Sequence, residues 1–149
     1  YQKALALYQK LLGPEHPHVA TSLNNLALVL SRQGKNAEAE TLLQKALALR
    51  HKRLGPEHPE VATSLDSLAG VLFRQGKNAE SEALYQKALA LYQKRLGPEH
   101  PDVATSLNNL AGFYLGQGRL EQAMPFLRQA ASIREAQLRT TVSETRMQA

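Results

Sequence analysis

The sequence predicts an all-α fold, a solenoid of antiparallel helical hairpins with about seven helices. Three observations support this fold class. The string LGPEHP occurs at Leu12–Pro17, Leu54–Pro59 and Leu96–Pro101, and each copy starts 42 residues after the one before it. Each 42-residue segment contains two stretches with apolar residues at helical spacing. A repeat of this length is one supersecondary unit that buries its apolar face against its neighbours.

The alignment of the copies predicts the domain organisation. Residues 12–53 and 54–95 match at 32 of 42 positions, whereas 54–95 and 96–137 match at only 17. The first ten residues, YQKALALYQK, repeat at 85–94. We therefore expect 1–12 to be the second helix of a truncated repeat, followed by repeats at 13–53, 54–95 and 96–138, the last of them divergent. Residues 139–149 would start a further helix or a linker to a following domain.

The first helix of each hairpin should begin at the proline that ends LGPEHP. Pro17 suits a first helical turn, because the backbone N–H that proline lacks would have no partner there. Gly34 should end this helix in a left-handed conformation. The apolar positions that define its buried face are Val19, Leu23, Leu26, Ala27 and Leu30.

The second helix should begin at Asn36, which we expect to cap it. Glu38 and Glu40 are favourable near its positive end. The apolar positions are Ala39, Leu42, Leu43, Ala46, Leu47 and Leu49, and Gly55 should end the helix. The cationic side chains Arg50, Lys52 and Arg53 in the last turns account for part of the net charge of +5.

The first helices should also carry a second, polar face. Projected at 100° per residue, the polar positions lie away from the buried stripe. In a solenoid of hairpins the first helices line the inside of the curve, so this face predicts the wall of a ligand groove. The positions are Thr21, Asn24, Asn25, Leu28 and Arg32, then Thr63, Asp66, Ser67, Gly70 and Arg74, then Thr105, Asn108, Asn109, Gly112 and Gly116.

The pattern LGPEHPxVATSLNNLAxxLxxQGKxAEAExLxxKALAL resembles the 42-residue tetratricopeptide repeats of kinesin light chains and their prokaryotic relatives. The resemblance extends from residue 1 to about 138 and implies a right-handed superhelix with a concave peptide-binding groove. It implies groove contacts from Asn24, Asn25, Asn108 and Asn109, whereas Asp66 and Ser67 depart from that pattern. It also implies helix-packing contacts at small residues, namely Ala27, Ala39, Ala46, Ala69, Ala88, Ala111, Ala123 and Ala130.

The expected function is that of a protein-interaction module binding a partner's peptide segment in the groove. Arg32 and Arg74 favour an acidic ligand. An alternative is a regulatory repeat arm, fused to or partnered with a caspase-like (CHAT) protease or a nucleotide-binding switch domain. The C-terminal run IREAQLRTTVSETRMQA is similar to the junction that leads into such protease domains, and Thr141–Glu144 reads as a capping box for a new helix.

A third interpretation is self-assembly through a repeat edge. Residues 1–12 lack a first helix, so the face of Ala4, Leu5, Leu7, Tyr8 and Leu11 should lose part of its cover. We expect such a fragment to pack end to end, or to fray at Tyr1–Lys3.

Several function classes are not expected. The chain has no cysteine, which excludes thiolate chemistry and favours a reducing, cytoplasmic compartment. No catalytic constellation and no cofactor motif is predicted. A metal site is not predicted either, because His16, His58 and His100 recur in turns that lie too far apart to share a metal ion. No apolar run could span a membrane. The basic residues are not interleaved with exposed aromatics, so specific nucleic-acid binding is not expected.

Overall fold

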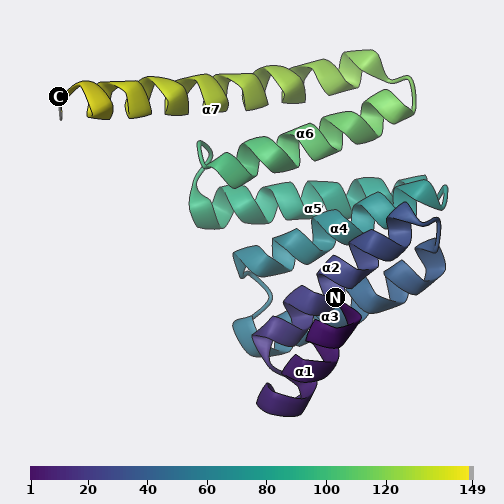
Figure 1. Ribbon diagram of the computed structural model, residues 1–149. Coiled ribbons are helices and arrows are strands. Elements are labelled where there is room, and N and C mark those ends of the chain that lie inside the picture. The colour runs from purple at the N-terminus through teal and green to yellow at the C-terminus, as the bar shows by residue number, and fades with distance from the viewer. Residues whose placement is uncertain (148–149) are drawn as a thin grey trace. The chain divides into compact units, whose positions relative to one another are not determined.

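The computed structural model describes residues 1–147, and within them the chain is a series of seven helices (Figure 1). They are α1 (Gln2–Leu12), α2 (Pro17–Arg32), α3 (Asn36–Leu54), α4 (Pro59–Arg74), α5 (Asn78–Leu96), α6 (Pro101–Gly116) and α7 (Leu120–Met147). No β-strand occurs in this described part of the chain. The predicted all-α class and the number of helices are therefore confirmed.

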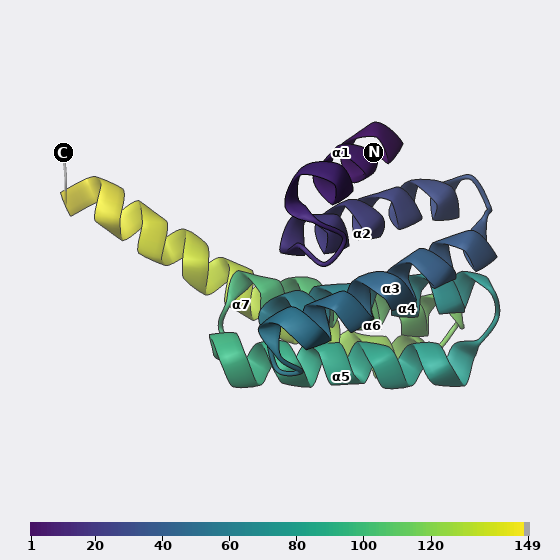
Figure 2. The ribbon, with the colours of Figure 1, turned by 90° about the horizontal axis from the view of Figure 1, so that it is seen from below.

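The helices form two compact units, Tyr1–Leu91 and Tyr92–Ala149, and the boundary falls within α5. In the first unit α1 packs on α2, α2 pairs with α3, and α3 packs on α4. In the second unit α6 and α7 form an antiparallel pair (Figures 1 and 2). The α2–α3 and α6–α7 hairpins thus each bury an apolar stripe between their two helices.

Small side chains occupy the closest contacts between helices. All eight alanines that the family resemblance marked for packing are buried, among them Ala27, Ala39 and Ala111 with no exposed surface. In the first unit Ala27, Ala39 and Leu43 form one apolar cluster with Leu68 and Leu72 of α4. A residue as small as alanine lets helix axes approach closely, so neighbouring hairpins can interlock.

Glycine and proline separate the helices as expected. Gly34, Gly76 and Gly118 take φ values of 74–80°, in the left-handed region. The backbone N–H of Lys35 reaches back to the carbonyl of Leu30 at 2.9 Å, which satisfies one of the last free carbonyls of α2. Pro17, Pro59 and Pro101 each occupy the first turn of their helix.

One predicted helix cap and one predicted helix start are wrong. Helix α3 begins at Asn36 as expected, but its N-cap is Lys35, which makes no side-chain capping bond. The Asn36 Oδ1 atom instead accepts a hydrogen bond from the Ser31 hydroxyl at 2.8 Å. No helix starts at Thr141 either, because α7 is continuous to Met147 and the Thr141 hydroxyl donates to the carbonyl of Gln137 at 3.0 Å. Pro125 lies inside α7 without ending it.

The amino-terminal edge has the incomplete cover that the sequence suggested. No residue of α1 is fully buried, and Ala4, Leu7 and Leu11 are exposed. Leu5 and Tyr8 are half-buried against the cluster of Val19, Ala20, Leu23 and Ala46. Whether this edge associates with another molecule stays a prediction.

Candidate functional site

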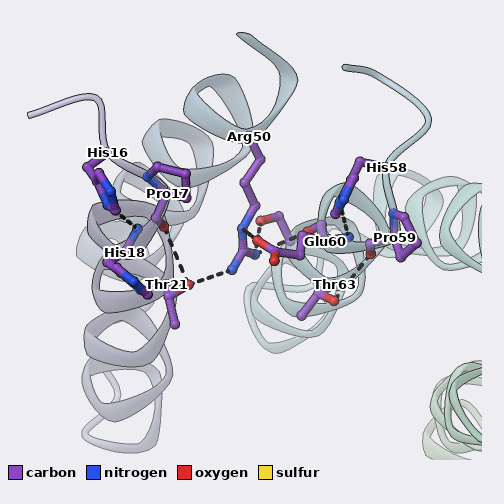
Figure 3. Close-up of polar contacts among 10 residues, drawn as sticks. His16, Pro17, His18, Thr21, Arg50, His58, Pro59, Glu60 and Thr63 are labelled. Atoms are coloured by element: carbon purple, nitrogen blue, oxygen red, sulfur yellow. Dashed lines mark hydrogen bonds and ion pairs between the residues drawn. The ribbon is translucent and has the colours of Figure 1, made fainter. Parts of the chain in front are cut away.

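The first helices are positioned by histidine caps in the LGPEHP turns (Figure 3). The Nδ1 atom of His16 accepts a hydrogen bond from the backbone N–H of His18 at 3.2 Å. His58 and His100 accept in the same way from Glu60 and Asp102, both at 3.1 Å. An N-cap satisfies a backbone donor that has no partner inside the helix. The recurring histidine is therefore a capping residue, and each first helix starts at the same point of its repeat.

The predicted wall residues of α2 do not all face solvent. Thr21 and Arg32 are exposed, Leu28 is exposed as well, and Asn25 is half-buried. Asn24 is an exception, because its side chain is only 5% exposed and its Oδ1 atom has no hydrogen-bond partner within residues 1–147. The prediction that Asn24 lies on an open wall is therefore wrong, since the residue turns into the packing of the hairpin.

On α4 the predicted residues form a continuous stripe. Asp66, Gly70 and Arg74 follow one another at four-residue spacing and so share one helix face. The Tyr85 hydroxyl from α5 lies beneath Gly70, where an added Cβ atom would come within 3.2 Å of it. Burial raises the pKa of Tyr85 to about 12, with a further increase from the negative charge of Asp66 and an opposing effect of Arg74. Thr63 is exposed and Ser67 half-buried beside the stripe.

Arg74 is held in place by the preceding repeat. Its Nη1 atom donates to the Ser31 hydroxyl of α2 at 3.0 Å, and that hydroxyl in turn donates to Asn36. Arg74 nevertheless remains exposed. The sequence did not mark Ser31, a buried residue that directly precedes Arg32. The Arg74 guanidinium of α4 is therefore fixed by a hydrogen bond to α2.

The wall residues of α6 lie in the second unit. Thr105, Asn109, Gly112 and Gly116 are exposed, and Asn108 is half-buried. With its amide oxygen turned toward α7, Asn108 accepts hydrogen bonds from Nη2 and Nη1 of Arg134 at 2.7 and 3.1 Å. A Cβ atom added at Gly112 would meet no other atom within 4 Å. Gly112 is the equivalent of Leu28 on α2, so at this position α6 leaves open the space that a leucine side chain occupies on α2.

One buried arginine escaped the sequence analysis. The sequence grouped Arg50 with Lys52 and Arg53 as cations of the last turns of α3, but Arg50 is only 4% exposed. Its Nη1 atom donates to the Ser64 hydroxyl at 2.7 Å and to the carbonyl of Glu60 at 3.1 Å. Nη2 contacts the Thr21 hydroxyl at 3.4 Å, and Nε lies 3.4 Å from the Glu60 carboxylate (Figure 3). Arg50 therefore joins three helices of the first unit.

Ion pairs on the outer side link successive turns. Glu15 pairs with Lys52 at 2.5 Å and with Arg53 at 2.8 Å, and the Lys52 hydrogen bond is the main reason why the pKa of Glu15 is lowered. Glu40 accepts from Gln75 and Lys77, which lowers its pKa in the same order of importance. These cations are thus partnered by carboxylates of the same surface.

Two hollows in the first unit lie outside the predicted wall. One is formed by Leu12–Pro17 together with Arg53. The other lies between the start of α1 and the apolar residues Leu26, Val29 and Leu30 of α2. Among the described residues, no group of three or more His, Cys, Asp or Glu side chains could hold a metal ion. No helix within residues 1–147 is long and apolar enough to cross a lipid bilayer.

Capped first helices, alanine contacts and a polar face repeated every 42 residues define a helical-repeat scaffold. Tetratricopeptide repeat models match residues 1–18, 19–60 and 60–136. The chain belongs to the tetratricopeptide repeat family, and it is of the kinesin-light-chain-like type. This fold is typically a non-catalytic scaffold that mediates protein–protein interaction.

Solved structures agree with this assignment. BtubC (BKLC) from P. vanneervenii is 26% identical with a TM-score of 0.77, over 92% of this chain and 55% of that one. The nearly identical TPR-like repeats of a Podosopora anserina kinesin light chain are 31% identical with a TM-score of 0.70, over 89% and 63%. The TPR domain of Arabidopsis FLU shares the fold at 22% identity, with a TM-score of 0.65 over 78% of this chain and 95% of that one. The chain thus spans about 55–63% of the first two structures. No significant match is found among curated protein sequences.

Proposed function

We propose that the chain binds an extended or short helical segment of a partner protein along the polar faces of the first helices α2 and α4. Acidic residues of that segment would pair with Arg32 and Arg74. The observation that supports this most directly is the state of Arg74, which is exposed and yet fixed by Ser31 at 3.0 Å. A guanidinium that is already oriented loses less side-chain entropy when it binds a carboxylate.

The remaining residues of the stripe would contact the ligand in different ways. Asn25 and Ser67 are partly accessible and can hydrogen-bond to a peptide backbone. At Gly70 the ligand would meet the Tyr85 hydroxyl, which lies 3.2 Å from the position of an added Cβ atom and can hydrogen-bond. Asp66 on the same stripe favours a cation or an N–H donor next to the acidic residue. The site therefore fits a segment of mixed polarity with at least one acidic side chain.

The experiment is a selection of peptides from a random library against the whole chain. We expect the enriched sequences to contain acidic residues. The double variant Arg32→Glu and Arg74→Glu should lose at least tenfold in affinity while keeping its helical circular dichroism, since a tenfold loss corresponds to about 1.4 kcal/mol. The matched control is Lys45→Glu with Lys87→Glu, which makes the same charge change at exposed, equivalent positions of α3 and α5. Equal losses in both double variants would show an effect of net charge alone.

A second proposal is that the array is the regulatory arm of a larger signalling protein with a CHAT protease or a nucleotide-binding switch domain. The observation that favours it is the continuity of α7, because an unbroken helix can transmit a displacement beyond the repeats. A caspase-like His/Cys pair in the full-length protein would support this role. A full-length protein that contains neither type of domain would exclude it.

The absence of cysteine in all 149 residues supports a reducing, cytoplasmic compartment for either role. End-to-end self-association through α1 is a separate proposal. Light scattering at rising concentration tests it, and a constant monomer mass would contradict it.

A further inference from the structure

The carboxyl-terminal hairpin has an arginine at the position equivalent to Arg50, but this arginine has different hydrogen-bond partners. Arg134 lies 84 residues, or two repeats, after Arg50 and occupies the same position on its second helix. Arg50 is buried between α2 and α4, whereas Arg134 is exposed. The two arginines thus show the same position with and without a covering first helix.

The partners of the two arginines differ in a consistent way. Arg50 extends toward α4, where it binds Ser64 and the Glu60 carbonyl, and it leaves the Oδ1 atom of Asn24 without a partner among residues 1–147. Arg134 instead turns back to α6 and donates to Asn108, which is the equivalent of Asn24. Where no following helix offers a hydroxyl and a carbonyl to the arginine, the asparagine of the arginine's own hairpin is therefore its acceptor.

Apolar surface on α7 adds to this evidence. Leu138 is 68% exposed, whereas its equivalent Leu54 on α3 is half-buried. Leu127 is half-buried, whereas its equivalent Leu43 has no exposed surface and packs in the cluster with Leu68 and Leu72 of α4. Two leucines, half-buried Leu127 and exposed Leu138, thus flank the Arg134 guanidinium on this face of α7.

We propose that the face of α7 formed by Leu127, Arg134 and Leu138 docks an amphipathic helix of a partner protein. The internal α3–α4 contact indicates the chemistry of that helix. It would have a carboxylate in its first turn and a hydroxyl four residues later, like Glu60 and Ser64. Leucines eight and twelve residues after the carboxylate, like Leu68 and Leu72, would cover the two leucines of α7.

Residues 139 and 140 of α7 indicate the source of this helix. The Gly-Pro pair that turns the chain from α3 into α4 is replaced by Arg139 and Thr140, and α7 continues to Met147. Its last turns extend past the start of α6 (Figure 1). A helix on this face would therefore not arrive through the short turn used inside the array, which is why we assign the face to a partner. This surface shares no residue with the polar stripe of Asp66, Gly70 and Arg74 on α4.

A peptide with the sequence of residues 57–76, which contains α4, is a suitable probe because it carries the required side chains. We expect it to cause saturable NMR shifts at residues 127–138 of the ¹⁵N-labelled whole chain. The side-chain amide of Asn108 should shift as well, because Arg134 would leave it for the hydroxyl and carbonyl of the peptide. A change at Asn108 distinguishes this exchange from a simple hydrophobic contact.

Variants on both sides complete the test. Arg134→Ala should weaken peptide binding at least about tenfold, which corresponds to 1.4 kcal/mol, and so should the peptide with Glu60→Ala and Ser64→Ala. Arg128→Ala removes another exposed arginine of α7 and should leave the affinity unchanged. The proposal is overturned if binding does not saturate, if the shifts fall on residues 13–53, or if Arg134→Ala binds like the original chain. The same shifts on concentrating the chain alone would make a second copy the occupant and would also contradict it.

Discussion

The guanidinium of Arg50 reaches from α3 to the Ser64 hydroxyl of α4 at 2.7 Å, and this contact joins one repeat to the next. The same side chain also contacts Thr21 of α2. Burying an arginine is costly unless acceptors and a counter-charge lie close. Here hydroxyl and carbonyl oxygens accept from Nη1 and Nη2, and the Glu60 carboxylate forms an ion pair with Nε at 3.4 Å. The orientation between the hairpins of the first unit therefore depends on a polar contact as well as on alanine packing.

Removing this contact should be costly. We expect Arg50→Ala to lower the free energy of unfolding by about 3 kcal/mol, because it leaves buried acceptors without donors and opens a cavity. Arg50→Tyr should cost less, since tyrosine stands at the equivalent positions 8 and 92. Urea denaturation measures both variants. Arg53→Ala, which breaks an exposed ion pair with Glu15, is the control and should change stability by less than about 1 kcal/mol.

The histidine caps make a second prediction. His58→Ala should destabilise the chain by about 1 kcal/mol, because the N–H of Glu60 loses its side-chain acceptor. His58→Asn should recover most of that loss, since asparagine is among the best N-cap residues. Thermal unfolding followed by circular dichroism compares the two. Equal destabilisation by both substitutions would show that the imidazole acts through packing and not as a cap.

Two helical glycines at equivalent positions should respond differently to alanine. Gly112→Ala should stabilise the chain by about 0.5–1 kcal/mol, because alanine favours helix and its Cβ meets nothing within 4 Å. Gly70→Ala should gain less, because its Cβ would press on the Tyr85 hydroxyl at 3.2 Å. Combining Gly70→Ala with Tyr85→Leu should restore the gain relative to Tyr85→Leu alone. Chemical denaturation of the four variants decides, and equal effects at both glycines would contradict the Tyr85 contact.

The carboxylate of Glu40 should make stability depend on acid pH. Hydrogen bonds from Gln75 and then Lys77 hold its pKa below the usual 4.5, so the folded state binds a proton less readily than the unfolded chain. Its contribution is complete above pH 4.5 and is lost as the pH falls through the lower folded value. We expect Glu40→Gln to flatten the acid limb of a stability–pH curve. Glu38→Gln, at an exposed carboxylate in the same turn, should leave that limb in place.

Much of the fold could be predicted because its signals are local. LGPEHP contains the glycine that ends one helix and the proline that starts the next, and Gly34 and Gly76 adopt the expected positive φ. The continuity of α7 could also have been read from Arg139 and Thr140, which replace the Gly-Pro pair. A threonine followed by a glutamate three residues later is ambiguous, because threonine can equally bond back inside a helix, as Thr141 does.

The side-chain network could not be predicted because its partners are distant in sequence. Arg50 contacts residues 14 and 29 positions away, and a cation in the last turns of a helix usually faces solvent. Asn24 and Asn108 are equivalent in sequence, yet only Asn108 is bound by an arginine, because the difference depends on what covers the second helix. Helical projection separates faces but does not show which polar face the next hairpin covers.

The measurement that tests the interaction role most directly is NMR mapping of a library-selected acidic peptide on the ¹⁵N-labelled chain. The account predicts that backbone shifts concentrate at positions 25–32 and 67–74 of α2 and α4, and that the Arg74 side-chain Nε–H signal moves on binding. Shifts spread over the outer ion pairs at Glu15, Lys52 and Arg53, with Arg74 unchanged, would contradict the assignment of the polar face as the binding site.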